Sequence, residues 1–259
     1  MNLKKVITYI TIPYGFTWIL WMPLLLNRQF AMNLPIISGQ FYIVSFRSFI
    51  AAVVMSLVMG GFKSLGEWAK RAYSIRFKSK WILISLVFPL FYGIIAVIAY
   101  RIVVGIWPDF TQFGLTNKLP GLNLLETTII WILTFGLGEE SGWRGFLLPE
   151  LCKKFSIKNS ALIVAAIWLF WHLPAFLFNE NYMNMGFGII GWGISLTFGS
   201  IFLAWLCQGS EFSVIPVLIW HGGFDLLTAS DQAAQVMAMV CSVFVIIQGV
   251  YISRKLPSR

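Results

Sequence analysis

Eight long apolar stretches dominate this sequence of 259 residues. A helix needs about 20 mainly apolar residues to cross the hydrocarbon layer of a membrane, and the stretches are close to that length. Apolar residues make up 58% of the chain and charged residues only 11%, so a water-soluble globule would lack polar surface. We therefore expect an all-α, polytopic membrane protein with about eight transmembrane helices, at residues 6–26, 41–62, 81–106, 122–150, 159–177, 187–207, 212–228 and 233–252.

Basic residues indicate how these helices are oriented. Most of the nineteen lysines and arginines cluster on one side of the predicted spans, at residues 4–5, 63–80, 153–158 and 254–259. The loops on the other side keep only Arg28 and Lys118. Because basic loops stay in the cytoplasm, we expect both termini there, in a bacterial plasma membrane. The net charge of +9 then reflects topology, and the lipid bilayer, not nucleic acid, is the expected partner.

The chain shows no linker or internal repeat, so residues 1–259 are predicted to form a single transmembrane domain. Cys152, Cys207 and Cys241 are widely spaced and odd in number, which favours neither a disulfide framework nor a thiolate metal site. Arg47 and Arg101 lie near the outer ends of their predicted spans. We expect both side chains to extend to the headgroups and to take no part in chemistry, so a substitution of Arg47 should leave activity largely intact.

Two adjacent glutamates stand inside the fourth apolar stretch. Glu140 and Arg144 are four residues apart, so they can pair on one helical face, while Glu139 is turned by about 100°. Two neighbouring carboxylates cannot both ionise easily in a low-dielectric site, so one of them can accept and release a proton. Glu139 is thus a candidate general base. A buried ion pair that only locks helix packing would show the same spacing.

The two histidines of the chain lie in later apolar stretches, His172 in the fifth and His221 in the seventh. With a helical rise of about 1.5 Å per residue, Glu140, His172 and His221 all lie about 15–21 Å from the basic side. This common depth favours one shared polar cavity. Asp225 follows His221 by one helical turn and can orient its ring. Nearby glycines leave room for a substrate or simply allow close helix packing.

Taken together, EExxxR at Glu139–Arg144, an aromatic residue four before His172, and HxxxD at His221 resemble the CAAX protease and bacteriocin-processing (CPBP, or Abi) family of intramembrane proteases. The resembling core covers about residues 122–228. Trp168 stands where phenylalanine is usual, and Asp225 replaces the asparagine of the eukaryotic CAAX enzymes.

The resemblance implies an eight-helix fold with an active site that opens toward the cytoplasm. It also implies that Glu139 and His172 activate a water, that His221 and Asp225 stabilise the oxyanion, and that Glu140 and Arg144 support the site. Trp168 would be a further structural support. Peptide hydrolysis needs a base for water and a donor for the oxyanion, and these residue types supply both.

A metal ion is an open alternative at this point. Glu139, His172 and His221 are residue types that bind zinc. The HExxH spacing is absent, however, which favours a water activated by glutamate without metal.

Three functional classes remain to be compared. We expect a CAAX-type endopeptidase that acts on membrane-associated or leader peptides, such as a secreted leader, a pheromone or a bacteriocin. One alternative is a non-catalytic membrane scaffold or bacteriocin-immunity protein. The other is a proton-coupled transporter, in which buried carboxylates and histidines relay protons. Carriers commonly have duplicated halves, which this sequence lacks.

Overall fold

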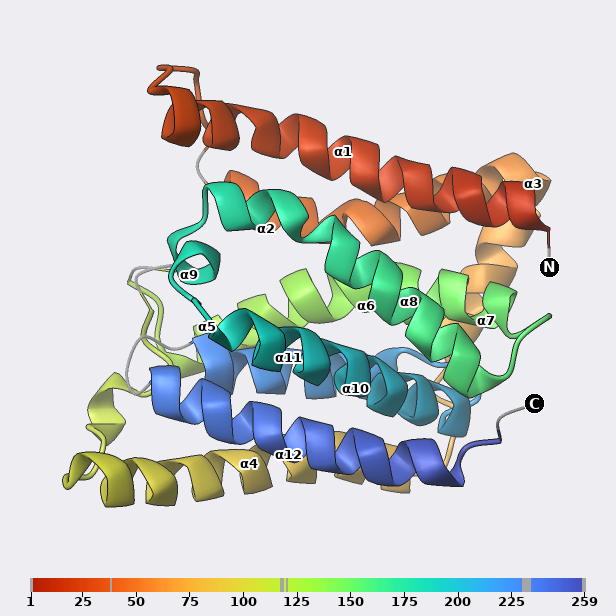
Figure 1. Cartoon of the computed structure of the whole chain (residues 1–259). Helices are drawn as coiled ribbons and strands as arrows, with labels where there is room; N and C mark the ends of the chain where they lie inside the picture. Colours follow the sequence, from red (N-terminus) through yellow and green to blue (C-terminus); the bar gives the residue numbers. More distant parts are fainter. Residues whose placement is uncertain (1, 38, 117–118, 120, 230–233, 258–259) are drawn as a thin grey trace.

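A computed structural model shows the chain as a bundle whose long helices run roughly side by side (Figure 1). It describes residues 2–37, 39–116, 119, 121–229 and 234–257. Lys118 and Arg259, which contributed to the expected orientation, lie outside these ranges. Within the described ranges the regular elements are all helical. The predicted all-α class is therefore confirmed.

The elements follow one another along the chain as a series of long helices interrupted by short ones. They are α1 (Leu3–Phe30), α2 (Gln40–Ile43), η1 (Val44–Phe46), α3 (Arg47–Ala72), α4 (Lys80–Val104), η2 (Phe110–Gln112), α5 (Leu124–Trp131), η3 (Ile132–Glu139), α6 (Glu140–Gly142), η4 (Trp143–Leu147), α7 (Leu148–Leu151), α8 (Ile157–Trp171), η5 (Leu173–Leu177), α9 (Glu180–Met183), α10 (Gly188–Gly209), α11 (Ile215–Ala229) and α12 (Ala234–Lys255).

Six helices in the described part of the chain are long and apolar enough to cross a membrane. Their outer faces carry exposed large apolar side chains, such as Phe62 at 85% and Ile102 at 76% exposure, which suit a lipid environment. The other two predicted stretches carry the two glutamates and His221. The first is the broken run from α5 to α7, and the second is α11, with only 15 residues. The expected number of about eight is thus approximate.

The broken run from α5 to α7 contains two π-helical segments, η3 and η4, on either side of Glu140. Short π-helical segments often mark functional sites, because the wider turn redirects side chains. Glycines let neighbouring backbones approach closely here. A Cβ added to Gly142 would overlap the Ser48 carbonyl of α3, and one on Gly136 would lie 2.6 Å from the Leu218 oxygen of α11. The close-packing explanation of these glycines is therefore confirmed.

Helix α3 bends sharply at Gly60 and Gly61. Gly61 has a φ of 63° and a ψ of −153°, a conformation that costs a residue with a side chain far more than glycine. The bend separates an apolar first half, which packs against α1 and α6, from the basic second half.

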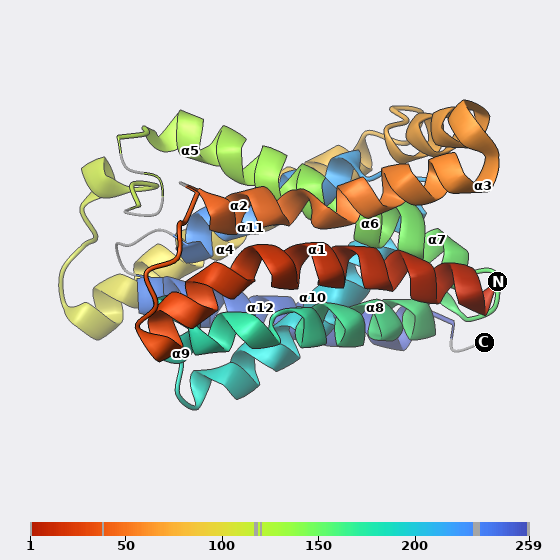
Figure 2. The ribbon, with the colours of Figure 1, turned by 90° about the horizontal axis from the view of Figure 1, so that it is seen from above.

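The two termini lie at the same end of the bundle (Figure 1). The link between α7 and α8 is also at this end, while α9 and the start of α5 lie at the opposite end, as both views show (Figures 1 and 2). We call the first the terminal end and the second the α9 end.

Candidate active site

Glu140 is a fully enclosed charged group of the site. Its side chain has no exposed surface, and its Oε1 accepts hydrogen bonds of 2.8 Å from both Arg144 Nη1 and His221 Nδ1. The predicted pairing of Glu140 with Arg144 is therefore observed. The contact with His221 joins α6 to α11. The glutamate motif and the His221 motif therefore lie at the same depth along the bundle, as the helical rise predicted.

Glu139 is paired too, with a partner that the sequence did not indicate. Arg47 Nη1 lies 3.3 Å from Glu139 Oε1, and both side chains are almost fully buried, at 0% and 3% exposure. The expectation that Arg47 extends to the headgroups is wrong. Its guanidinium lies instead over the Trp171 ring, 3.1 Å from the ring centroid, and also donates to the Val44 carbonyl.

The physical reason for this error is that burying a carboxylate without a counter-charge is costly. Arg47 supplies that charge from α3, where Ser48 also donates hydrogen bonds to the backbone carbonyls of Gly138 and Glu139. Glu139 Oε2 is buried and has no hydrogen-bond partner among the described residues. One oxygen of Glu139 is thus held, and the other can accept a proton.

His172 lies just after the end of α8 with a defined tautomer. Its Nδ1 is 2.7 Å from the Trp168 carbonyl, which can only accept, so Nδ1 carries the hydrogen. The other nitrogen, Nε2, is then available as an acceptor when the ring is neutral. Among the described residues, four rings surround the imidazole, with centroids at 4.4 Å for Trp171, 5.2 Å for Trp192, 5.8 Å for Tyr182 and 6.0 Å for Trp168.

His221 lies between two carboxylates. Its Nδ1 contacts Glu140, and its Nε2 lies 3.7 Å from Asp225 Oδ2. Asp225 is one turn further along α11, as the HxxxD spacing predicted, and its side chain is more exposed, at 21%. Trp168 packs its ring edge-on to His221, with centroids 5.5 Å apart, and lies 4.8 Å from the Arg144 guanidinium. Trp168 thus contacts residues of two motifs, and its role as a structural support stays a prediction.

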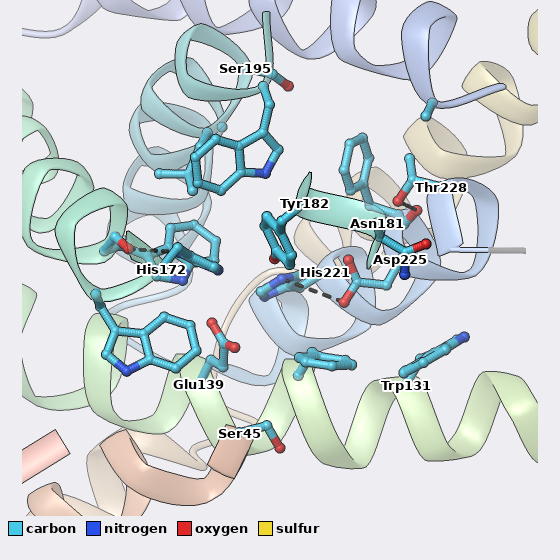
Figure 3. Close-up of a pocket in the computed structure, with 18 of the residues that line it drawn as sticks. Ser45, Trp131, Glu139, His172, Asn181, Tyr182, Ser195, His221, Asp225 and Thr228 are labelled. Carbon is cyan, nitrogen blue, oxygen red and sulfur yellow. Dashed lines mark hydrogen bonds and ion pairs between the residues drawn. The ribbon is translucent and has the colours of Figure 1, made fainter. Parts of the chain in front are cut away.

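Glu139, His172, His221 and Asp225 line one cavity of about 410 Å³. In Figure 3, Glu139, His172 and His221 point toward a common space, Tyr182 lies beside His221, and Asp225 lies beyond His221. Glu140 and Arg144 lie behind it and do not line it. The cavity wall is largely aromatic. Its further lining residues include Trp21, Tyr42, Trp131, Phe135, Trp168, Trp171, Trp192 and Phe224.

The donor set does not fit a metal ion. Within the described ranges, no three His, Cys, Asp or Glu side chains gather closely enough to hold one. His221 has a carboxylate facing each nitrogen, and His172 has one nitrogen engaged by a carbonyl. We therefore derive no catalytic step through a metal.

Sequence reasoning missed several residues that complete the site. Arg47 and Ser48 come from α3, Tyr182 from α9 and Trp192 from α10. Ser45, Arg47 and Ser48 do form a polar group inside an apolar run, which is a usable signal for a buried face. No sequence pattern marks Tyr182 or Trp192. They reach the cavity because of how the chain around α9 and the start of α10 folds, which the sequence does not reveal.

Comparisons with known proteins agree with the motifs. Residues 121–227 match the family described as type II CAAX prenyl endopeptidase Rce1-like. The chain is also similar to the CAAX prenyl protease 2 of Methanococcus maripaludis, at 21% identity over 220 residues, which cover 82% of this chain and 80% of that protein. The predicted family resemblance is therefore confirmed.

Proposed function

From the premise that this chain is a CAAX-type intramembrane peptidase with an Rce1-like region at residues 121–227, we propose that Glu139 and His172 activate a water molecule to cleave a peptide bond. The observation that supports it best is the arrangement of their acceptor atoms. Glu139 Oε2 has no hydrogen-bond partner among the described residues, and His172 keeps Nε2 available, beside the same cavity.

Water activation follows from these two acceptors. A water held between them loses a proton to Glu139 as its oxygen attacks the scissile carbonyl carbon. Glu139 can later pass that proton to the leaving amine. Arg47 keeps the carboxylate in place through its other oxygen. Proton transfer by a positioned side chain typically contributes about 10²–10⁴-fold to a rate.

His221 is the proposed donor to the oxyanion. Both of its nitrogens face carboxylates, an arrangement that favours hydrogens on both. Nδ1 is used by Glu140, whereas Nε2 lies 3.7 Å from Asp225 Oδ2, beyond hydrogen-bond distance, so its hydrogen can be donated to a substrate carbonyl. An ionised Asp225 cannot donate, so its proposed role is to orient the His221 ring. Glu140 and Arg144 hold that ring from behind.

The proposed substrate is a membrane-associated or leader peptide. An aromatic cavity suits apolar side chains, and the lining has no lysine among the described residues. Its one arginine, Arg47, is already paired with Glu139. Among the described residues of the lining, none is an unpaired lysine or arginine. We propose that the cleaved bond is an internal one. Secreted leaders, pheromones and bacteriocins of a bacterial membrane belong to this class.

Cleavage assays on the purified protein in detergent test the mechanism. Glu139→Gln and His172→Ala should each reduce turnover of a cleaved membrane peptide by about 10²–10⁴-fold, the range expected for loss of general base catalysis. Glu67→Gln, which changes an exposed carboxylate on α3, is the matched control and should behave like the parent. Equal turnover in all four proteins would refute the assignment of Glu139 and His172 as catalytic residues.

The same assay tests the proposal that no metal takes part. Prolonged chelation followed by dialysis should leave turnover unchanged. If activity disappeared and one particular metal ion restored it, the metal-free mechanism would be wrong.

A further inference from the structure

The oxyanion of the proposed reaction needs hydrogen-bond donors. When water attacks a peptide carbonyl, the electron pair of the C=O double bond moves onto the oxygen, and sites that stabilise this charge commonly use more than one donor. His221 Nε2 can supply one. Asp225, one turn further along α11, is a carboxylate and cannot donate while it is ionised. A second donor must therefore come from another element.

Other polar side chains of the cavity lining are directed elsewhere. Ser45 Oγ and Thr228 Oγ1 donate to backbone carbonyls three and four residues earlier, at 2.7 Å and 3.1 Å. In Figure 3, Ser195 lies on the far side of the cavity from Glu139. These hydroxyl groups are thus poorly placed to reach the oxygen of a carbonyl that Glu139 and its water attack.

Tyr182 lines the cavity next to the catalytic side chains. It comes from the short helix α9, between η5 and α10, and Figure 3 shows its side chain beside His221. Its ring packs against other aromatic rings, with centroids 5.0 Å from that of Phe176 and 5.8 Å from those of Trp192 and His172. These contacts restrict the orientation of the side chain, so its hydroxyl group is held in place before a substrate binds.

The surroundings of the Tyr182 hydroxyl keep its hydrogen in place. Burial raises the pKa of Tyr182, the negative charges of Glu139 and Asp225 raise it further, and the positive charge of Arg47 acts in the opposite direction. The hydroxyl is therefore neutral and able to donate. It also lies within electrostatic range of Glu139 on one side and of Asp225 on the other.

We propose that Tyr182 is a second oxyanion donor, whose hydroxyl and His221 Nε2 donate to the same substrate carbonyl oxygen. As the water oxygen bonds to the carbonyl carbon, the C=O electron pair becomes the oxyanion, and Tyr182 stabilises it without transferring its proton. When that pair re-forms the carbonyl, the C–N bond breaks and the amine leaves with the proton that Glu139 took from the water. This role rests on the proposed function and adds to it a donor from α9.

Tyr182→Phe tests the role, because it removes the hydroxyl and keeps the ring. For a peptide that the parent cleaves, kcat should fall by about 10²–10³-fold, the range typical for loss of one oxyanion donor, with KM little changed. The melting temperature should match that of the parent. Tyr100→Phe is the matched control and should keep parental kcat, since Tyr100 is a partly buried tyrosine of α4 that does not line the cavity.

A pair of inhibitors separates a donor from a packing residue. In a phosphinate peptide, a tetrahedral and negatively charged group replaces the scissile bond and resembles the oxyanion state. Its Kd should rise in Tyr182→Phe by about the factor by which kcat/KM falls. The Kd of the same peptide with an uncharged, uncleavable methylene bond should stay unchanged.

Three outcomes would overturn the proposal. Parental kcat in Tyr182→Phe, with turnover lost in Glu139→Gln, would refute the role of Tyr182 alone and leave the proposed function intact. Parental kcat in Glu139→Gln would refute the proposed function and this role with it. A lower melting temperature in Tyr182→Phe, with binding of both inhibitors weakened equally, would make Tyr182 a packing residue.

Discussion

At the level of single residues, the site is organised around two carboxylates with different counter-charges. Glu140 shares one oxygen between Arg144 and His221, whereas the Glu139 carboxylate pairs, among the described residues, with Arg47. Adjacent residues on one helix thus face different partners, because they are turned by about 100° from each other. The carboxylate with two partners is thus distinct from the one that we propose to exchange protons.

Replacing Arg47 tests the role of the pair that sequence reasoning missed. Arg47→Gln leaves Glu139 buried without its counter-charge, a change that typically costs about 3–5 kcal/mol. We expect a lower melting temperature and a fall in kcat, with KM little changed because the Arg47 guanidinium is fully buried and engaged by Glu139, Val44 and the Trp171 ring. Arg47→Lys, which keeps the charge but not the planar group over Trp171, should restore part of kcat.

Arg101→Gln is the matched control, since Arg101 also lies near the α9 end of a long helix but is exposed. It should retain parental kcat and stability. Full activity of Arg47→Gln would show that Glu139 does not need this partner.

Sequence reasoning predicted the Glu140–Arg144 pair and the common depth of the motifs because both follow from helical spacing. It could not predict that Arg47 turns inward, since spacing gives the depth of a residue but not the direction in which its helix is rotated. The same limit applies to Tyr182 and Trp192, whose positions depend on how α9 and its flanking loops fold back over the cavity.

At the level of elements, backbone contact fixes the run from α5 to α7 against its neighbours. Gly142 of α6 lies against the Ser48 carbonyl of α3, and Gly222 of α11 lies against the backbone of Ile132. Close approach of this kind is how helices associate in lipid, where the hydrophobic effect does not drive them together. The positions of Glu139 and Glu140 therefore depend on these small residues.

Gly142→Ala tests this dependence. The added Cβ overlaps backbone atoms, which cannot move as a flexible side chain can, so α3 and α6 must separate. We expect a lower melting temperature, by an overpacking cost of about 1–3 kcal/mol, and reduced turnover. Gly191→Ala in α10 is the control, because nothing lies within 4 Å of its added Cβ. Equal melting of both variants would show that the contact is not tight.

The helical segments themselves were largely predictable, because a run of about 20 apolar residues has few alternatives in lipid. The π-helical segments were not. They arise from contacts between α6, α3 and α11, which no local pattern encodes.

At the level of the whole molecule, one acidic residue ties the start of the chain to its middle. Glu150 of α7, at the terminal end, accepts hydrogen bonds from Lys5 of α1 at 2.9 Å and from Lys153 at 2.6 Å. Partial burial alone would raise the pKa of Glu150, but the bonds from Lys153 and Lys5 outweigh it and hold the pKa below its usual value. The folded protein therefore favours the carboxylate form.

This direction predicts a pH-dependent contribution to stability. A carboxyl whose pKa is lowered by folding stabilises the folded state above its unfolded value, here 4.5, and loses that effect as the pH falls through the folded value. Glu150→Gln should melt at a lower temperature than the parent near neutral pH, and the difference should shrink at about pH 3. Glu67→Gln should match the parent at both pH values. A difference that is the same at both would contradict the assignment.

The position of Arg47 also means that residues 121–227 do not form a self-sufficient site. The recognisable segment, residues 121–227, holds the two glutamates and both histidines, yet the counter-charge of Glu139 comes from α3, more than seventy residues before that segment begins. If the segment were transplanted into a foreign set of membrane helices, it would arrive with an uncompensated buried charge. The segment and α3 should therefore be inherited together. In related sequences, the residue at position 47 should vary together with the residue at position 139.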